Sequence, residues 1–372
     1  MNILYVSHDV QLNGAPKSLL ELVTRICDKG VHPIVIVPCK GNLKGELDKR
    51  GIDTRIIEYR QCVYEENYNL IDYWSVNLKA VISIMKLIRE ENINIVHSNS
   101  LAVNVGAIAA NILHIPHVWH FREYLQEDFA YKVICPFLMK WLVKKSRCCI
   151  AISEGIKRKY SDKYGGNIVK LYNGMESSLY FNPIQPNIGK YKEKKLLIAG
   201  TIQEGKGQWD AIRAAEELIG RGVDVHLCIV GNGSPEYVNR LKKYVKKRDL
   251  SKFIEFKPFT NNLQELRMQS DLILVCSRME AFGRVTAEAM MSGKIVIGSN
   301  SGGTLELIGK SEERGYLYTY GNPIELADKI QYILEHEKEV YEKEILAQNF
   351  VLKLTDINKY ASKLVCIYKK II

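Results

Sequence analysis

The 372-residue sequence lacks the features of several large protein classes. Its nine cysteines form no C-x-x-C pair and are odd in number, so neither a disulfide framework nor a cysteine zinc site is expected. The most apolar stretch, residues 101–113, is broken by Asn104 and Asn111, well short of the ~20 residues that a membrane-spanning helix needs. Met1 leads into a strand-like run instead of a signal peptide. These absences favour reduced thiols and a cytoplasmic location.

Motifs for common cofactors and metals are also missing. No G-x-G-x-x-G follows the first strand-like run, which argues against a dinucleotide-dependent dehydrogenase. A complete Walker A sequence, an H-E-x-x-H pair and an Asp-x-Asp pair beside a strand are absent too. We therefore expect no cofactor and no bound metal ion.

Acidic residues are fewer than basic ones, 42 against 52, which gives a formal net charge of +10. Such a charge suits a nucleic acid, an anionic membrane surface or an anionic substrate. No recognised nucleic-acid-binding module accompanies it, so we expect no nucleic-acid partner.

What the sequence does contain is a regular alternation of short, β-rich apolar runs with segments of helical period. This alternation predicts an α/β fold with parallel sheets covered by helices on both faces. The chain is long enough, and at 47% apolar residues hydrophobic enough, for two such domains. The predicted strands of the first half are Leu4–Val6, Ile34–Val37, Ile95–His97, His117–Trp119 and Cys149–Ser153. Those of the second half are Leu196–Ala199, His226–Val230, Phe253–Phe256, Leu272–Cys276 and Ile295–Ile297.

The best candidate for a linker is the segment 181–195, which contains two prolines, a glycine and a run of charges. We place the domain boundary within it, which gives a first domain of residues 1–185 and a second of 186–357. Each doubly wound domain is expected to bind ligands at the carboxyl ends of its strands. The last residues, 360–372, have the pattern of an amphipathic helix.

Residues 271–307 are the most informative part of the chain. They predict a buried strand, a glycine turn, a helix starting near Gly283, a second buried strand and another glycine turn. Glu280 and Glu288 lie eight positions apart, and Glu288 is about 7 Å along the helix at 1.5 Å per residue. Between them, the free amides and positive dipole end of the helix favour a phosphate group.

This arrangement resembles the nucleotide-sugar site of the retaining glycosyltransferases of family 4, also described as glycosyl transferases group 1, which have the GT-B fold. Similar segments follow in order over nearly the whole chain: Asn13–Pro16, Asn94–Ser100, His117–Glu123, Ala151–Glu154, Tyr172–Met175, Leu196–Thr201, Gly205–Gly207 and Cys228–Gly233. The resemblance implies two Rossmann-like domains that face a central cleft. The first would bind the acceptor and the second the nucleotide sugar, and a helix at about 358–372 would pack back on the first.

The resemblance also implies roles for individual residues. His120 and Glu280 would contact the donor sugar, Lys206 would bind the diphosphate, and these three are the candidate catalytic residues. Glu288 would hold the ribose hydroxyls. The remaining expected donor contacts are Gly14, Thr201, Gly231, Phe259, Ala281, Phe282, Gly283 and Val285. Arg122 is a candidate for acceptor binding.

Two departures from the family pattern affect the phosphate site. Thr201 stands where the family typically has an arginine, and Asn13-Gly14 replaces two consecutive glycines. We infer that Arg284 takes over as a diphosphate partner, because a cation in the first turn of a helix opposes the helix dipole unless an anion binds there. The alternative is a surface ion pair between Arg284 and Glu288, which are four residues apart. For three other candidates the alternatives are also structural. Lys206 and Glu280 could be solvated turn residues, and His120 could be a packed side chain.

The predicted function is transfer of a hexose or N-acetylhexosamine from a nucleoside diphosphate sugar to a hydroxyl group, with retention and without a metal, in polysaccharide or glycoconjugate assembly. The main alternative is a catalytically silent partner subunit of the same fold, and a sugar-nucleotide epimerase is a third. Between Phe129 and Cys149 the chain has five cations and no acid. Lys140, Lys144 and Lys145 could meet an anionic membrane, with Phe137 and Trp141 at the interface, and so bring a lipid-linked acceptor to the enzyme. The alternatives are an ordinary core helix and a soluble saccharide acceptor.

Overall fold

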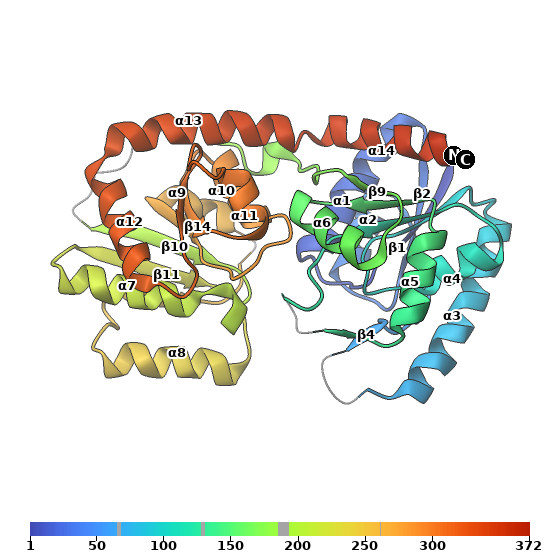
Figure 1. Ribbon diagram of the computed structural model, residues 1–372, viewed down its shortest axis with the longest axis horizontal. Coiled ribbons are helices and arrows are strands. Elements are labelled where there is room, and N and C mark those ends of the chain that lie inside the picture. The colour runs from blue at the N-terminus through green and yellow to red at the C-terminus, as the bar shows by residue number, and fades with distance from the viewer. Residues whose placement is uncertain (65–67, 128–130, 185–192, 261) are drawn as a thin grey trace. The chain divides into compact units, whose positions relative to one another are not determined.

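The computed structural model describes residues 1–64, 68–127, 131–184, 193–260 and 262–372. It divides into unit 1, residues Met1–Glu176 with Thr355–Ile372, and unit 2, residues Ser177–Leu354 (Figure 1). The division comes earlier along the chain than the boundary placed between 185 and 186. Most of the predicted linker, residues 185–192, lies outside the described residues, as does the start of the basic segment at 129 and 130.

Unit 1 is built on a seven-stranded parallel sheet in the order β3-β2-β1-β5-β6-β8-β9. The strands are β1 (Asn2–Val6), β2 (His32–Val37), β3 (Asp53–Ile56), β5 (Ile95–Ser98), β6 (His117–Phe121), β8 (Cys148–Ala151) and β9 (Ile168–Lys170). A separate antiparallel pair joins β4 (Val63–Tyr64) to β7 (Lys132–Val133).

Helices cover both faces of this sheet. Successive side chains of a strand point to opposite faces, and apolar side chains on both faces are buried under helices. Ile3 and Tyr5 of β1 pack in one core with α1, α2 and α14, whereas Leu4 and Val6 pack in another with α3 and α4. The helices are α1 (Gly14–Ile26), α2 (Asn42–Lys49), α3 (Leu70–Glu90), α4 (Val105–Ile112), α5 (Pro136–Lys145), α6 (Glu154–Tyr164) and α14 (Ile357–Ile371), with short 3₁₀ turns η1 (Cys27–Lys29) here and η2 (Ser177–Leu179) in unit 2.

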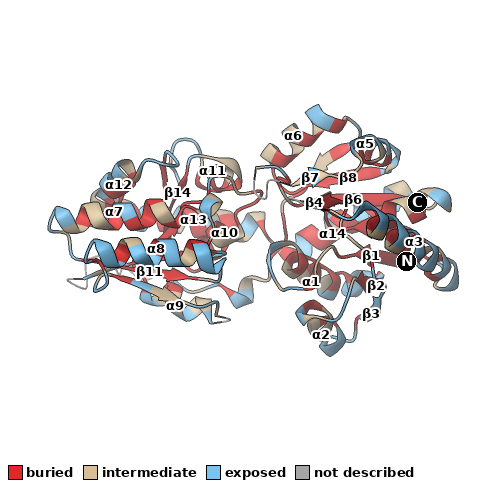
Figure 2. Ribbon diagram, turned by 90° about the horizontal axis from the view of Figure 1, so that it is seen from below, coloured by how far each residue is buried: buried red, intermediate tan, exposed pale blue. Residues whose placement is uncertain are grey.

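Unit 2 has a six-stranded parallel sheet in the order β12-β11-β10-β13-β14-β15. Its strands are β10 (Lys194–Ala199), β11 (Val225–Val230), β12 (Ile254–Lys257), β13 (Leu272–Val275), β14 (Ile295–Ser299) and β15 (Tyr316–Tyr318). Its helices are η3 (Glu204–Lys206), α7 (Gln208–Gly220), α8 (Pro235–Lys247), α9 (Leu263–Gln269), α10 (Arg284–Met291), α11 (Gly302–Ile308), α12 (Pro323–Glu335) and α13 (Glu337–Leu354). Figure 2 shows the strands mostly in red, as buried elements.

Both sheets have the strand order of a doubly wound fold, with a point where the order along the chain reverses. In unit 1 this point lies between β1 and β5, and in unit 2 between β10 and β13. In doubly wound folds, loops that leave neighbouring strands at such a point diverge to opposite sides, and ligands bind at this carboxyl edge. Gly14 follows β1, Thr201 and Lys206 follow β10, and Glu280 follows β13.

The predicted fold class is confirmed, and each of the ten predicted strands overlaps an observed one. The strands that the sequence did not indicate in the two large sheets are β3, β9 and β15, and all three lie at a sheet edge. β3, with the sequence Asp-Thr-Arg-Ile, is largely exposed and leaves little apolar pattern, whereas β9 and β15 have only three residues each. Among the described helices, none has both the length and the apolar run needed to cross a bilayer.

Candidate functional site

Lys206 and Glu280 meet at the carboxyl edge of the unit 2 sheet. Lys206 ends the short turn η3 that follows β10, and Glu280 lies in the segment that follows β13. The ammonium nitrogen of Lys206 is 2.8 Å from Oε1 of Glu280. Two residues that the sequence assigned to one ligand, 74 positions apart along the chain, therefore form an ion pair.

Gly207 makes this meeting possible. Its backbone has φ +70°, and a Cβ there would overlap the carbonyl group of Cys276. Without that Cβ, the turn lies directly on the end of β13, where the Arg278 amide donates a 2.8 Å hydrogen bond to the Gly205 carbonyl oxygen. The fixed turn then holds Lys206 against Glu280.

The ion pair sets the charge of Glu280. Burial alone would raise the pKa of this carboxyl group, but the charge and hydrogen bond of Lys206, with a hydrogen bond from Ser277, outweigh burial and hold the pKa below its usual value. Glu280 is therefore ionised at neutral pH. A carboxylate in this state accepts strong hydrogen bonds from hydroxyl groups.

The chain after Glu280 is clamped by the start of α11. The Gly303 amide donates a 2.6 Å hydrogen bond to the Glu280 carbonyl oxygen, and a Cβ on Gly302 or Gly303 would overlap the backbone of residues 280–282. Ala281 and Phe282 are buried here, and Gly283, with φ +82°, is the residue before α10. The helix thus begins where the sequence predicted, with its N-terminal end next to Glu280.

Glu288, inside α10, is buried between two cations. Oε2 accepts a short hydrogen bond from Nη2 of Arg267 on α9, and Oε1 lies 3.6 Å from Nη2 of Arg284. The side chains of Glu288 and Arg267 are 8% and 3% exposed. Arg284 also donates a hydrogen bond of 3.2 Å to the Tyr180 hydroxyl group. The ion pair of the alternative interpretation is therefore present, though buried, and a diphosphate role for Arg284 stays a prediction.

Arg267 was not identified from the sequence. It lies 21 positions before Glu288 on the short helix α9, so no local spacing connects the two residues. Further contacts hold it in place: Nη1 donates to Gln264, and the guanidinium group lies 5.9 Å from the ring centre of Tyr180.

The other expected donor residues of unit 2 follow the carboxyl ends of the same sheet. Thr201 comes after β10 and Gly231 after β11, and the two turns touch, because a Cβ on Gly231 would overlap the Gly200 carbonyl oxygen. Phe259, after β12, is 62% exposed, and its amide bonds to Oδ1 of Asn232. Val285 lies in the first turn of α10.

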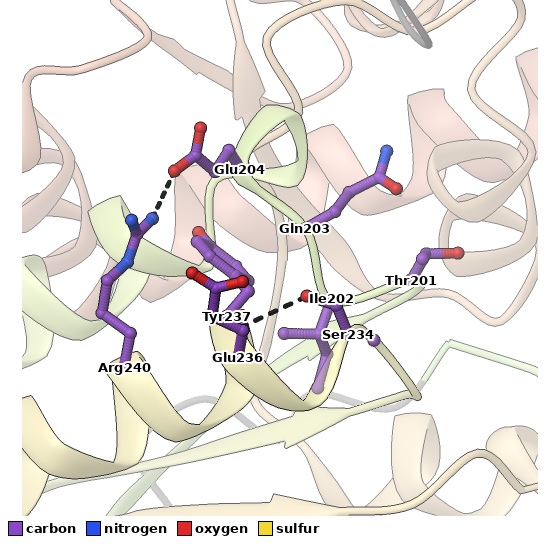
Figure 3. A pocket seen from close by; sticks show the side chains of 9 residues that line it. Thr201, Ile202, Gln203, Glu204, Ser234, Glu236, Tyr237 and Arg240 are labelled. Atoms are coloured by element: carbon purple, nitrogen blue, oxygen red, sulfur yellow. Dashed lines mark hydrogen bonds and ion pairs between the residues drawn. The ribbon is translucent and has the colours of Figure 1, made fainter. Parts of the chain in front are cut away.

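A pocket of about 360 Å³ opens beside this group of residues, after β10 and β11 (Figure 3). Thr201, Gln203 and Gly233 line it together with Glu204, Glu236 and Arg240, and Arg240 is paired with Glu204. Lys206 and Glu280 do not line it. Two carboxylates against one cation make the pocket unfavourable for a diphosphate and better suited to hydroxyl or amide groups.

In unit 1, His120 is the centre of a buried polar cluster at the carboxyl end of β6. Arg122 donates from Nη2 to Nδ1 of His120 at 3.3 Å, from Nε to Asn99 at 2.8 Å and from Nη1 to Asn173 at 2.6 Å. Arg122 is only 5% exposed, so its guanidinium group is largely engaged inside the protein. Its expected role in acceptor binding stays a prediction; what the structure places there is a residue that orients His120.

The same cluster reaches the C-terminal helix. Nε2 of His97 lies 3.3 Å from Nδ1 of His120, and Nδ1 of His97 lies 2.6 Å from the Tyr368 hydroxyl group on α14. That hydroxyl group is 3.0 Å from the Tyr5 hydroxyl group. His97, at the end of a predicted strand, thus connects His120 to α14.

These contacts determine where each proton lies. A guanidinium group only donates, so Nδ1 of His120 must be an acceptor. Burial, with the charge of Arg122, holds the pKa of both His97 and His120 well below the usual value, so both rings are neutral. His120 therefore carries its proton on Nε2. His97 in turn donates from Nε2 and accepts from Tyr368 at Nδ1.

The Nε2–H group of His120 is buried, and among the described residues it has no hydrogen-bond partner. A buried donor without an acceptor costs about 1–3 kcal/mol, so this group is suited to an acceptor atom of a ligand. At neutral pH it can donate a hydrogen bond, but it cannot act as a general base.

Gly14 is the first residue of α1, and a Cβ there would meet no atom within 4 Å. The helix starts two residues before Pro16. Pro16 still fits, because the first helical amides have no partner within the helix. Over the described residues, no three or more His, Cys, Asp or Glu side chains are grouped so as to hold a metal ion.

Comparison with known proteins agrees with these observations. Residues 12–179 match the family described as Glycosyltransferase Family 4, and residues 182–348 match Glycosyl transferases group 1. An uncharacterized glycosyltransferase of Methanocaldococcus jannaschii is 26% identical over 83% of this chain and 89% of its own length. The UDP-Gal:alpha-D-GlcNAc-diphosphoundecaprenol alpha-1,3-galactosyltransferase of Escherichia coli is 26% identical over 65% of this chain and 66% of its own. The crystal structure of Anabaena HepE in complex with UDP has the same fold, with a TM-score of 0.83, 21% identity and full coverage of both chains.

The buried Glu288–Arg267 pair yields a prediction for stability. Replacing Arg267 with Met should cost about 3–5 kcal/mol of unfolding free energy, because the buried carboxylate of Glu288 would lose its charge-assisted hydrogen bond from Arg267. The double change Arg267→Met/Glu288→Met should cost less than the sum of the single changes. Urea unfolding of the three variants measures these costs. Lys329→Met, which breaks the more exposed pair with Glu312 (side chains 31% and 25% exposed), is the control and should cost about 1 kcal/mol or less. Additive costs would contradict the pairing.

The neutral state of His120 yields a prediction for pH dependence. Below pH 6.5 the unfolded chain protonates this histidine and the folded chain does not, so the unfolding free energy should fall as pH falls. The histidine contributes a slope of ~1.4 kcal/mol per pH unit, which His120→Gln removes. Urea unfolding of both proteins between pH 6.5 and 5 measures it. Glu123, whose pKa burial raises to about 7, acts in the opposite direction but is common to both proteins. Equal slopes would show that folded His120 titrates normally.

Proposed function

Because the chain belongs to glycosyltransferase family 4, with the GT-B fold, we propose that it transfers a hexose or N-acetylhexosamine from a nucleoside diphosphate sugar to an acceptor hydroxyl group, with retention. The proposed setting is the assembly of a cell-surface polysaccharide or glycoconjugate. The acceptor is a saccharide or a lipid-linked saccharide. A location in the cytoplasm, at the inner face of the membrane, is consistent with nine free cysteines.

The observation that carries the proposal is the ion pair of Lys206 and Glu280 beside the first turn of α10. It brings together an ionised carboxylate for sugar hydroxyls, and an ammonium group and the N-terminal amides of a helix for phosphate. Binding of a donor would place the diphosphate near Lys206 and the sugar near Glu280. The ammonium group can serve both, since it carries three hydrogen-bond donors.

The proposed reaction is a displacement on one face of the sugar. The bond between the anomeric carbon and the phosphate oxygen breaks through an oxocarbenium-like state, and the acceptor oxygen bonds to the same face. The departing phosphate oxygen takes the acceptor's proton. The protein contributes orientation and stabilises charge on the leaving group, through Lys206 and the amides of α10, with Arg284 as a further partner.

His120 has a defined part in this proposal. Its buried Nε2–H group is a fixed donor, suited to an oxygen of the donor sugar. Because the ring is neutral, this contact adds no positive charge beside a developing oxocarbenium ion. Glu288 is proposed to hold the ribose hydroxyls, with Arg267 and Arg284 fixing the direction of its carboxylate.

The main alternative is a catalytically silent subunit of the same fold, and Thr201 in place of the family's arginine favours it. Against it, Lys206, Glu280 and Glu288 are all present and placed by specific contacts. An epimerase is the third candidate. Incubation with a panel of nucleotide sugars separates the three, since a transferase consumes donor in the presence of acceptor, an epimerase isomerises the donor alone, and a silent subunit only binds it.

Replacing Glu280 with Gln should reduce the transfer rate by two or more orders of magnitude while the chain stays folded. A charge-assisted contact used in the transition state contributes about 2–4 kcal/mol, and Gln keeps the shape but not the charge. Donor turnover with a saccharide acceptor measures the effect. The matched control is Glu312→Gln, which breaks another 2.8 Å Lys–Glu pair of unit 2 and should leave turnover unchanged. Near-normal transfer by Glu280→Gln would refute the site.

Transfer should persist in excess chelator, because the proposal neutralises the diphosphate with Lys206, Arg284 and helix amides. The same assay, run with chelator and then with added Mg²⁺ or Mn²⁺, tests this. A complete loss that a metal restores would contradict the proposed mechanism. Thermal denaturation with and without chelator is the control, since a loss of folding would lower the midpoint as well.

A further inference from the structure

The outer side of α3 carries a stripe of exposed apolar side chains that the sequence interpretation did not include. Ile71, Trp74, Leu78 and Ile82 follow one another at spacings of three and four residues, which places them on one face of the helix. Ile71 is 83% exposed, Leu78 64% and Ile82 60%. The buried residues of α3 form a different face, toward the core with α4, and Figure 2 shows pale blue along the outer side of the helix.

Neighbouring helices continue this surface. Phe137 and Trp141, one turn apart on α5, are 87% and 44% exposed, and Ile112 at the end of α4 is 49% exposed. Helix α4 packs against both α3 and α5, so the three helices share one side of the unit 1 sheet (Figure 1). We call this surface the α3–α5 face, defined by Ile71, Trp74, Leu78, Ile82, Ile112, Phe137 and Trp141 with the cations described next.

Most charged residues of α3 and α5 are positive, although Lys86 is paired with Glu90 at 3.5 Å. Lys79, Lys86 and Arg89 are exposed on α3, and α3 has no acid between Asp72 and Glu90. Asp72 itself is paired with Arg60 at 2.9 Å. On α5 the exposed charges are Lys140, Lys144 and Lys145, and α5 has no acid.

On α3 and α5 the first exposed side chains are apolar and the last ones are mostly basic. Helices that connect parallel strands run opposite to them, so α3 and α5 both start at the carboxyl edge of the sheet. The antiparallel pair of β4 and β7, which precedes the two helices in the chain, lies at this edge. Trp74 and Phe137 are therefore near the edge that carries His120, and Lys86 and Lys145 lie toward the opposite edge.

We propose that the α3–α5 face binds an anionic lipid bilayer, with Trp74, Leu78, Ile82, Phe137 and Trp141 inserted at the level of the headgroups. A surface of exposed aromatic and aliphatic side chains, flanked by cations and poor in acids, fits such an interface in both polarity and charge. The inference deepens the proposed function, because a lipid-linked acceptor would then be presented at the carboxyl edge of unit 1. The binding itself requires no catalysis.

Sedimentation with vesicles tests the proposal on the full chain, without donor or acceptor. Wild type should bind vesicles of phosphatidylglycerol and phosphatidylcholine at low salt, bind pure phosphatidylcholine much less, and dissociate as salt rises. Trp74→Ser/Leu78→Ser/Ile82→Ser should weaken the partition coefficient at least about tenfold. Lys140→Gln/Lys144→Gln/Lys145→Gln should weaken it by about two orders of magnitude, since each basic residue contributes a factor of roughly five.

Two variants of unit 2 serve as matched controls. Lys242→Gln/Lys246→Gln/Lys247→Gln removes three exposed lysines from α8, a basic helix without an exposed large apolar side chain. Ile324→Ser/Leu346→Ser removes two apolar side chains of 50% and 54% exposure. Both should bind as wild type does. The proposal is wrong if wild type ignores anionic vesicles at low salt, or if the controls lose as much binding as the face variants.

A second copy of the chain is the competing occupant of this face. Sedimentation velocity of wild type and of the α3 variant decides between the two. If wild type is a dimer that the α3 variant makes monomeric, the face is an interface between copies and the bilayer proposal fails. If the purified enzyme also shows no transfer while vesicle binding persists, only the proposed function fails, so the two outcomes are distinguishable.

Discussion

The close approach of the turn after β10 to the end of β13 is the constraint on which the Lys206–Glu280 site of unit 2 depends. At this point the strand order reverses, so the two loops would otherwise diverge. Gly207 has no side chain to keep them apart, and the bond from Arg278 to Gly205 fastens them. The Lys206–Glu280 pair, the ionised state of Glu280 and its place beside α10 all follow from this contact.

Each unit places a network of buried polar groups at the carboxyl edge of its sheet, but the two networks differ in charge. In unit 2 the groups are ionised, and a carboxylate is held between cations on α9 and α10. In unit 1, His97 and His120 are neutral. The guanidinium group of Arg122 determines which atom donates in each hydrogen bond of the series Tyr5–Tyr368–His97–His120. Ionised groups suit phosphate and hydroxyl binding, whereas a neutral, oriented donor suits a site where positive charge develops.

The sequence predicted the fold class and the central strands, because buried parallel strands are continuous apolar runs that leave a strong local pattern. It also predicted the start of α10 and the residues that gather around it, through a family resemblance and helix geometry. It could not indicate Arg267 or the link from Tyr368 to His97. These partners are 21 and 271 positions apart, and only the folded chain brings them together. A prediction from residue types alone had no means of choosing between Arg284 as a phosphate ligand and Arg284 as a partner of Glu288.

The apolar residues of α3 show that the sequence also could not predict which apolar side chains stay exposed. In the sequence, Leu70 to Ile88 is a rich apolar segment that a core would explain, and its buried half does fill a core with α4. Only burial shows that Ile71, Trp74, Leu78 and Ile82 remain outside. The basic segment of α5, which the sequence did indicate, is thereby one part of a larger surface. The N-terminal ends of α3 and α5 and the polar cluster of His120 lie at the carboxyl edge of the same sheet. If α3 and α5 bind a bilayer, the sheet therefore sets the distance between the bilayer surface and His120, which a lipid-linked acceptor would have to span.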